Sequence, residues 1–156
     1  MQHLKIAAAQ FEPRDGDKAY NLSVIERLMA RAKEAGAQVI SFHELSITAY
    51  TFLKDLTPQQ VTDLAEPVPD GPSTKELIRL AKKYDIAILA GLVEIDDGAL
   101  YNTYVCVNAS GLVAKFSKLH PFIHPALTPG NGYVTFDLYG WTCGILICYD
   151  NNVVEN

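Results

Sequence analysis

Short, continuous apolar runs alternate along the chain with stretches whose apolar residues recur at helical intervals. Residues 4–10 and 39–42 are apolar runs of strand length. Residues 22–32, between these runs, have helical periodicity, with Asp17 as a cap before them and Gly36 as a stop after them. A strand, a helix and a second strand in this order favour parallel strand pairing, so the pattern predicts a βαβ unit.

The middle of the chain predicts an irregular segment followed by a helix and a strand. Residues 46–72 are rich in turn formers, and a short helix is expected to start at Thr57, where proline follows. Ser73 and Glu76 have the spacing of a capping box before the next amphipathic stretch. Residues 86–93 form an apolar run that predicts another buried strand.

Two hairpins are predicted in the remaining part. Residues 101–108 and 112–118 are strand-like and are joined by a glycine-containing turn. Residues 120–132 contain three prolines and two glycines, which indicates a loop. Residues 133–138 and 141–148 predict the last hairpin. The order of elements predicts an α/β fold in which helices pack on a mixed sheet.

Composition narrows the class of protein. With 156 residues and 49% hydrophobic content, the chain is expected to form a single domain, residues 1–156. The net charge of -5 and the scattered basic residues argue against a nucleic-acid partner. No apolar stretch reaches the roughly 18 residues of a membrane helix, so no membrane association is expected.

The cysteines indicate a compartment. The chain has an odd number of cysteines, Cys106, Cys143 and Cys148, and their spacing is not that of metal ligands. The first residues do not resemble a secretory signal. Free thiols in a reducing cytoplasm fit this pattern best. We therefore expect a cytoplasmic protein without a bound metal.

Three ionisable residues stand at the ends of apolar runs. Cys148 closes the run 144–148, which predicts a fully buried strand that ends at this thiol, and Glu44 and Lys118 end two earlier strand-like segments. Open α/β sheets place their chemistry at such strand ends. A thiol, a carboxylate and an ammonium can serve as nucleophile, general base and oxyanion stabiliser.

Each of these residues also has an ordinary interpretation. A free cysteine is often a small buried hydrophobe, and glutamate and lysine usually face solvent. Lys115 and Lys118 face opposite sides of one strand, so one is exposed and the other can point inward, where it would favour the thiolate. His120 and His124 offer a rival cysteine–histidine dyad with Cys148, and spacing alone does not rank these partners.

Three sequence blocks occur in a recognisable order. They are VISFHE (39–44) with Ala49 and Tyr50 after it, YNT (101–103) with FSKLH (116–120), and ILICYD (145–150) followed by Glu155. In order and spacing they resemble the N-terminal half of the carbon-nitrogen hydrolase (nitrilase) superfamily. The match spans the whole chain.

The resemblance implies an α-β-β-α sandwich, incomplete in this chain, and a Glu-Lys-Cys triad. Glu44 would be the general base, Cys148 the nucleophile and Lys118 the oxyanion stabiliser, with the backbone N–H of Tyr149 as second donor. The implied reaction is hydrolysis of a small amide or N-carbamoyl compound through a cysteine thioester, with release of ammonia or an amine. The family needs no metal or organic cofactor and forms homo-oligomers.

Four further residues are expected to support the site or contact substrate: His120, His124, Tyr50 and Asn151. The chain also departs from the family pattern. Ile123 stands where many members carry a second glutamate, His43 replaces a usual proline, and residues 152–154 replace Arg-Phe-Pro.

Two alternatives therefore remain open, a non-catalytic binding or scaffold module and a nitrile hydrolase, although Cys-aromatic-Asp argues weakly against a nitrile. The family fold usually continues beyond this length, so we expect the N-terminal portion of a longer domain.

Overall fold

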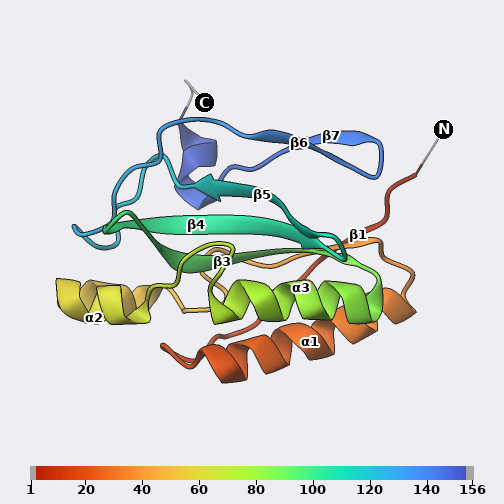
Figure 1. Cartoon of the computed structure of the whole chain (residues 1–156), viewed down its shortest axis with the longest axis horizontal. Helices are drawn as coiled ribbons and strands as arrows, with labels where there is room; N and C mark the ends of the chain where they lie inside the picture. Colours follow the sequence, from red (N-terminus) through yellow and green to blue (C-terminus); the bar gives the residue numbers. More distant parts are fainter. Residues whose placement is uncertain (1–2, 154–156) are drawn as a thin grey trace.

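A computed structural model describes residues 3–153 and places them in three layers (Figure 1). Helices α1 (Lys18–Glu34) and α3 (Pro72–Tyr84) cover one face of a five-stranded sheet. The hairpin of β6 (Thr135–Leu138) and β7 (Trp141–Gly144) lies over the other face. This is the expected α/β architecture, with a second sheet of two strands in the described part of the chain.

The five-stranded sheet is mixed. Its strands lie in sequence order: β1 (Ile6–Ala8), β2 (Val39–Ser41), β3 (Ala87–Asp96), β4 (Ala99–Asn108) and β5 (Gly111–Ser117). β1, β2 and β3 are parallel, which confirms the predicted βαβ unit, and β4 and β5 pair antiparallel, as the predicted hairpin requires. The parallel strands bring the end of β2 beside β3.

The helix boundaries follow from their capping residues. Asp17 caps α1, as predicted, by accepting a hydrogen bond from the backbone N–H of Tyr20. The predicted short helix is α2 (Pro58–Leu64), where Thr57 and Gln60 form a capping box. A 3-10 helix, η1 (Thr51–Asp55), precedes it in the segment expected to be irregular.

The predicted capping box at Ser73 is wrong. The helix α3 begins at Pro72, with Gly71 as its N-cap, because proline suits the first helical position and has no N–H to leave unpaired. The backbone N–H and hydroxyl of Ser73 instead donate to the buried carboxylate of Glu66, at 2.7 and 2.9 Å.

Two apolar layers stabilise the sheet. The first lies between the helices and the sheet, and its fully buried members include Ile25, Met29, Leu77, Leu80, Ile88 and Leu92. The second lies between the sheet and the hairpin, and it includes Tyr104, Cys106, Phe116, Leu138, Ile145 and Ile147. Burial of this apolar surface on both faces is the main favourable term in folding. Among the described residues, no helix combines the length and apolar character that crossing a bilayer requires.

The last predicted strand is shorter than expected. β7 ends at Gly144, residues 145–147 belong to no strand, and Cys148 opens the 3-10 helix η2 (Cys148–Asn152). The segment is not fully buried, since Leu146 is 38% exposed. Cys148 has a φ of +48°, a left-handed conformation that turns the chain and exposes this residue. The prediction of a fully buried strand ending at Cys148 is therefore wrong, although the thiol does stand where the chain leaves the core.

Candidate active site

Glu44 is held in a tight turn directly after β2. Leu45 has a φ of +49°, and the backbone N–H of Ile47 donates to the carbonyl of Gly91 on β3 at 3.0 Å. A Cβ atom on Gly91 would lie 2.4 Å from the backbone nitrogen of Leu45. The turn therefore packs against β3 only because residue 91 is glycine, and this contact places the Glu44 side chain at the sheet end.

Lys118 is the inward-pointing lysine of the two considered in the sequence. Its side chain is 1% exposed, and its Nζ lies 2.6 Å from Oε1 of Glu44. Its backbone N–H donates to the carbonyl of Asn102, and its carbonyl accepts from the N–H of Gly130, both at 2.8 Å. The other lysine, Lys115, is partly exposed and pairs with carboxylates of β3. A buried ammonium needs an anionic partner, and Glu44 supplies it.

Asp150 ties the cysteine turn to the lysine loop. Its buried carboxylate accepts backbone N–H groups from Ile147 and Leu119 at 3.3 Å and from His120 at 3.0 Å. These bonds connect residues on either side of the site that lie about 30 positions apart in the sequence. Cys148 is thus positioned relative to Lys118 by one carboxylate.

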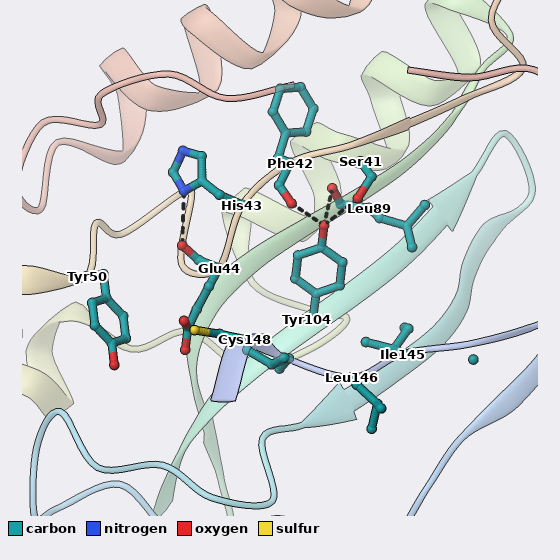
Figure 2. Close-up of a pocket in the computed structure, with 12 residues that line it drawn as sticks. Ser41, Phe42, His43, Glu44, Tyr50, Leu89, Tyr104, Ile145, Leu146 and Cys148 are labelled. Atoms are coloured by element: carbon teal, nitrogen blue, oxygen red, sulfur yellow. Dashed lines mark hydrogen bonds between the residues drawn. The ribbon is translucent and has the colours of Figure 1, made fainter. Parts of the chain in front are cut away.

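The three side chains meet at the carboxylate of Glu44. The sulfur of Cys148 lies beside this carboxylate (Figure 2), which raises the pKa of the thiol. Lys118 contacts the same carboxylate from the β5 side. The backbone N–H of Tyr149 lowers the pKa of the Cys148 thiol, so it also acts at this centre.

The environment raises the pKa of the Cys148 thiol. Burial is the main cause, followed by the negative charge and the hydrogen bond of Glu44. The Lys118 ammonium and the Tyr149 N–H lower this pKa, but they do not outweigh the other effects. Lys118 therefore favours the thiolate, as expected, but burial and Glu44 outweigh it, so the thiol keeps its proton beside the Glu44 carboxylate.

A cavity of about 620 Å³ opens beside Glu44 and Cys148 (Figure 2). Tyr104 lines it, and its hydroxyl hydrogen bonds with the Ser41 hydroxyl at 2.9 Å and donates to the backbone carbonyl of Phe42. Burial raises the pKa of Tyr104 to about 12, so its phenol remains neutral. A smaller cavity of about 340 Å³ also reaches Glu44, and it shares His43 and Tyr50 with the first.

Two of the predicted supporting residues lie at the centre. The Tyr50 ring centroid is 5.7 Å from Nζ of Lys118, and burial, together with the charges of Glu44 and Cys148, raises the pKa of Tyr50 to about 12. Asn151 donates from Nδ2 to the carbonyl of Cys148 at 3.1 Å. Both residues therefore belong to the immediate surroundings of the thiol.

The predicted histidines do not complete a dyad with the cysteine. His124 is buried and uses both ring nitrogens: Nε2 donates to the carbonyl of Leu56 at 3.0 Å, and Nδ1 accepts from the N–H of Ala126 at 3.1 Å. It stabilises the loop and has no ring nitrogen left to pair with Cys148. The side chain of His120 is exposed, and its backbone N–H donates to Asp150.

Ile123 also has a structural place. It packs, partly buried, against an apolar cluster that includes Leu45 and Leu53. Glu155, part of the third sequence block, lies outside the described residues 3–153. Within that described part, no group of three or more His, Cys, Asp or Glu side chains could hold a metal ion.

Two residues of the site were not singled out by the sequence. Nδ2 of Asn102 donates to Oε1 of Glu44 at 2.6 Å, and Asp150 anchors the cysteine turn. Both occur in the blocks that carry the family resemblance. Their place in these blocks could have drawn attention to them, but the sequence spacing did not predict which residues they contact.

The fold and the site together define a mixed α/β protein in which a thiol and a carboxylate line one pocket and a buried ammonium pairs with that carboxylate. The chain belongs to the carbon-nitrogen hydrolase family, whose model matches residues 5–156. It is 33% identical over 150 residues to a nitrilase from Pyrococcus abyssi, a match that covers 94% of this chain and 56% of the relative. It is 31% identical over 155 residues to an (R)-stereoselective amidase from a Pseudomonas species, covering 97% and 54%.

A solved structure has the same fold. The crystal structure of an amidase from Nesterenkonia sp. superposes with a TM-score of 0.80 at 23% identity, and the match covers 98% of this chain and 58% of that one. The expected sandwich architecture is therefore that of a known crystal structure. The chain thus spans about half the length of the relatives that it matches.

Proposed function

We propose that Cys148, Glu44 and Lys118 are the catalytic triad of an enzyme that hydrolyses a carbon–nitrogen bond in a small amide or N-carbamoyl compound. The observation that carries this proposal is the single carboxylate of Glu44, which contacts both the thiol and the buried ammonium. A scaffold module would gain little from a buried lysine paired in this way, because hydrophobic residues of similar volume are often as stable.

The raised pKa of the thiol defines the first step. Glu44 takes the proton from Cys148 as the sulfur attacks the amide carbon, because a thiolate does not accumulate beforehand. Negative charge then develops on the substrate oxygen, where the Lys118 ammonium and the Tyr149 N–H are the proposed donors. Glu44 passes the proton to the nitrogen, the carbon–nitrogen bond breaks, and ammonia or an amine leaves a thioester on Cys148.

The second half of the reaction reuses the same groups. Glu44 removes a proton from a water molecule, which attacks the thioester carbon, and the same donors stabilise the second oxyanion. The proton then returns to the sulfur as the acid product leaves. Each group thus keeps its role in both halves: Glu44 and Cys148 each lose and regain a proton, while Lys118 and the Tyr149 N–H donate without losing theirs.

The relatives support a small amide as substrate. Structures of the Nesterenkonia amidase include one with acrylamide added at the active-site cysteine and one in complex with butyramide. The Pyrococcus relative is named a nitrilase, so a nitrile is the second candidate. We also propose that the protein is cytoplasmic and forms a homo-oligomer. Three free thiols support the reducing compartment.

A screen for ammonia release tests the reaction. The protein is incubated with small aliphatic amides, N-carbamoyl amines and the matching nitriles, and the Cys148→Ala variant serves as control. We expect ammonia from amides or carbamoyl compounds with the natural sequence and none with Cys148→Ala. Release from nitriles alone would favour the second candidate, and no release from any compound would favour a non-catalytic module.

A further inference from the structure

Asn102 contacts both members of the buried ion pair. It lies on β4 opposite Val93, and its side chain is buried, with 1% exposure. Its backbone carbonyl accepts from the N–H of Lys118 at 2.8 Å, and its Nδ2 donates to Oε1 of Glu44 at 2.6 Å. A single residue thus fixes the backbone of the lysine and the carboxylate of the glutamate.

The geometry at Glu44 leaves one carboxylate oxygen unused by either donor. Nζ of Lys118 and Nδ2 of Asn102 both end on Oε1, each at 2.6 Å, so neither bond occupies Oε2. Rotation about the last bond of a glutamate is otherwise broad. Two donors that approach one oxygen from different elements hold that rotation and keep the carboxylate directed at the thiol.

The amide side chain of Asn102 is better suited to holding the Glu44 carboxylate than a second cationic side chain would be. Its hydrogen bond to an anion is charge-assisted, but it adds no charge that would compete for the proton Glu44 must accept. The lysine ammonium sits on a flexible stem and is also needed at the oxyanion, whereas Asn102 is held by the β4 ladder. The opposite end of this amide, Oδ1, is buried and has no hydrogen-bond partner among the described residues. A side chain kept only for stability would be expected to satisfy both ends.

We propose that Asn102 is a positioning residue that holds the Glu44 carboxylate in the orientation required for proton exchange with Cys148. The inference rests on the proposed function, because it assigns Glu44 the role of general base. It identifies a further member of the site beyond the triad, one that acts through Glu44 and touches no reacting atom.

Two substitutions and a neighbouring control test the positioning role. Asn102→Leu removes the donor and keeps the branching of the side chain, and we expect kcat to fall roughly tenfold to hundredfold with little change in KM. Asn102→Asp keeps the shape but turns an acceptor toward Glu44, so the acid limb of the pH–rate profile should also move to higher pH. The control is Thr103→Val, the next residue on β4. Its hydroxyl donates to a different buried carboxylate, Glu94, at 2.6 Å, so its loss should lower stability and leave kcat unchanged.

A double-mutant cycle separates positioning from general damage. If Asn102 acts through the carboxylate, adding Asn102→Leu to a Glu44→Gln background should cause little further loss of kcat. A purely structural residue would reduce kcat by the same factor in both backgrounds. Full additivity, or an unchanged kcat in Asn102→Leu alone, would overturn the proposal.

Crystal structures of the variants test the positioning role of Asn102 without requiring catalytic activity. In Asn102→Leu the Glu44 carboxylate should rotate or occupy two conformers, and in Thr103→Val it should stay in place. If the natural sequence hydrolyses no amide or nitrile while Glu44 is displaced in Asn102→Leu, the proposed function fails and the positioning holds. If Glu44 is undisturbed in Asn102→Leu, or in Asn102→Asp should the leucine variant not fold, the positioning role is rejected whatever the activity.

Discussion

Replacing Glu44 by glutamine should move thiol reactivity and turnover in opposite directions. The negative charge and the hydrogen bond of Glu44 both raise the pKa of Cys148, whereas Lys118 lowers it. In Glu44→Gln the two raising effects disappear and the ammonium loses its counter-charge. The pKa of the thiol should therefore fall, and more thiolate should be present at neutral pH. The base is also gone, so hydrolysis should nearly stop.

The structure indicates the size of both effects. Breaking a buried ion pair by removing one partner costs about 3–5 kcal/mol. The side chain of Lys118 is 1% exposed and that of Glu44 is 13% exposed, so the pair is shielded from water on the lysine side. We expect about 3 kcal/mol, the lower end, because the glutamine carbonyl still accepts from Nζ. Loss of a general base should reduce kcat by roughly 10²–10⁴-fold.

The assay follows alkylation of Cys148 by iodoacetamide as a function of pH, read by peptide mass spectrometry, together with ammonia release and urea unfolding. Glu94→Gln is the matched control, because Glu94 is also a buried carboxylate paired with a lysine, Lys115, but lies away from the thiol. The control should lose stability while its alkylation profile and kcat stay unchanged. An alkylation profile of Glu44→Gln that moves to higher pH, or does not move, would refute the assigned electrostatics.

Three other changes test the elements that build the site. Asp150→Asn weakens bonds to three backbone N–H groups, so it should cost about 1.5–3 kcal/mol in urea unfolding and lower kcat. Gly91→Ala places a Cβ atom 2.4 Å from the Leu45 nitrogen, and overpacking of this kind costs about 1–3 kcal/mol of stability. An unchanged kcat in this variant would contradict the role of the contact in placing Glu44. Burial raises the pKa of Cys106 from 9.0 to about 12, so its contribution to stability is complete below pH 9 and is lost as the pH rises toward 12. Between pH 9 and pH 12 the free energy of unfolding of the natural protein should fall by about 1.4 kcal/mol per pH unit more than that of Cys106→Ala. Equal pH dependence of the two unfolding free energies would contradict the effect of burial on Cys106.

Much of the architecture could be predicted because local patterns and packing agree. The apolar runs and the helical stretch between them led directly to the parallel pairing of β1 and β2. The hairpin of β4 and β5 followed from its turn residues. The residues of the proposed triad were also accessible from the sequence, because ionisable residues at the ends of apolar runs converge when those runs share one end of the fold.

Other features depend on tertiary contacts that no local pattern contains. An apolar run does not reveal whether a neighbouring strand pairs with it, so the predicted strand extended to Cys148, four residues beyond its observed end at Gly144. The capping box at Ser73 did not form, because Ser73 donates to the carboxylate of Glu66, seven positions earlier. The direction of the pKa shift of Cys148 depends on a balance between burial, one anion and one cation, which only their arrangement in space determines. The contact of Asn102 with Glu44 joins residues 58 positions apart.

The most direct measurement is trapping of the acyl intermediate. The protein is mixed with an amide that it hydrolyses, quenched in acid within one turnover, and digested for mass spectrometry. We expect the mass of the acyl group on the peptide that contains Cys148, and neither adduct nor ammonia from Cys148→Ala. Ammonia release that persists in Cys148→Ala, or an acyl group found only on another residue, would contradict nucleophilic attack by this thiol.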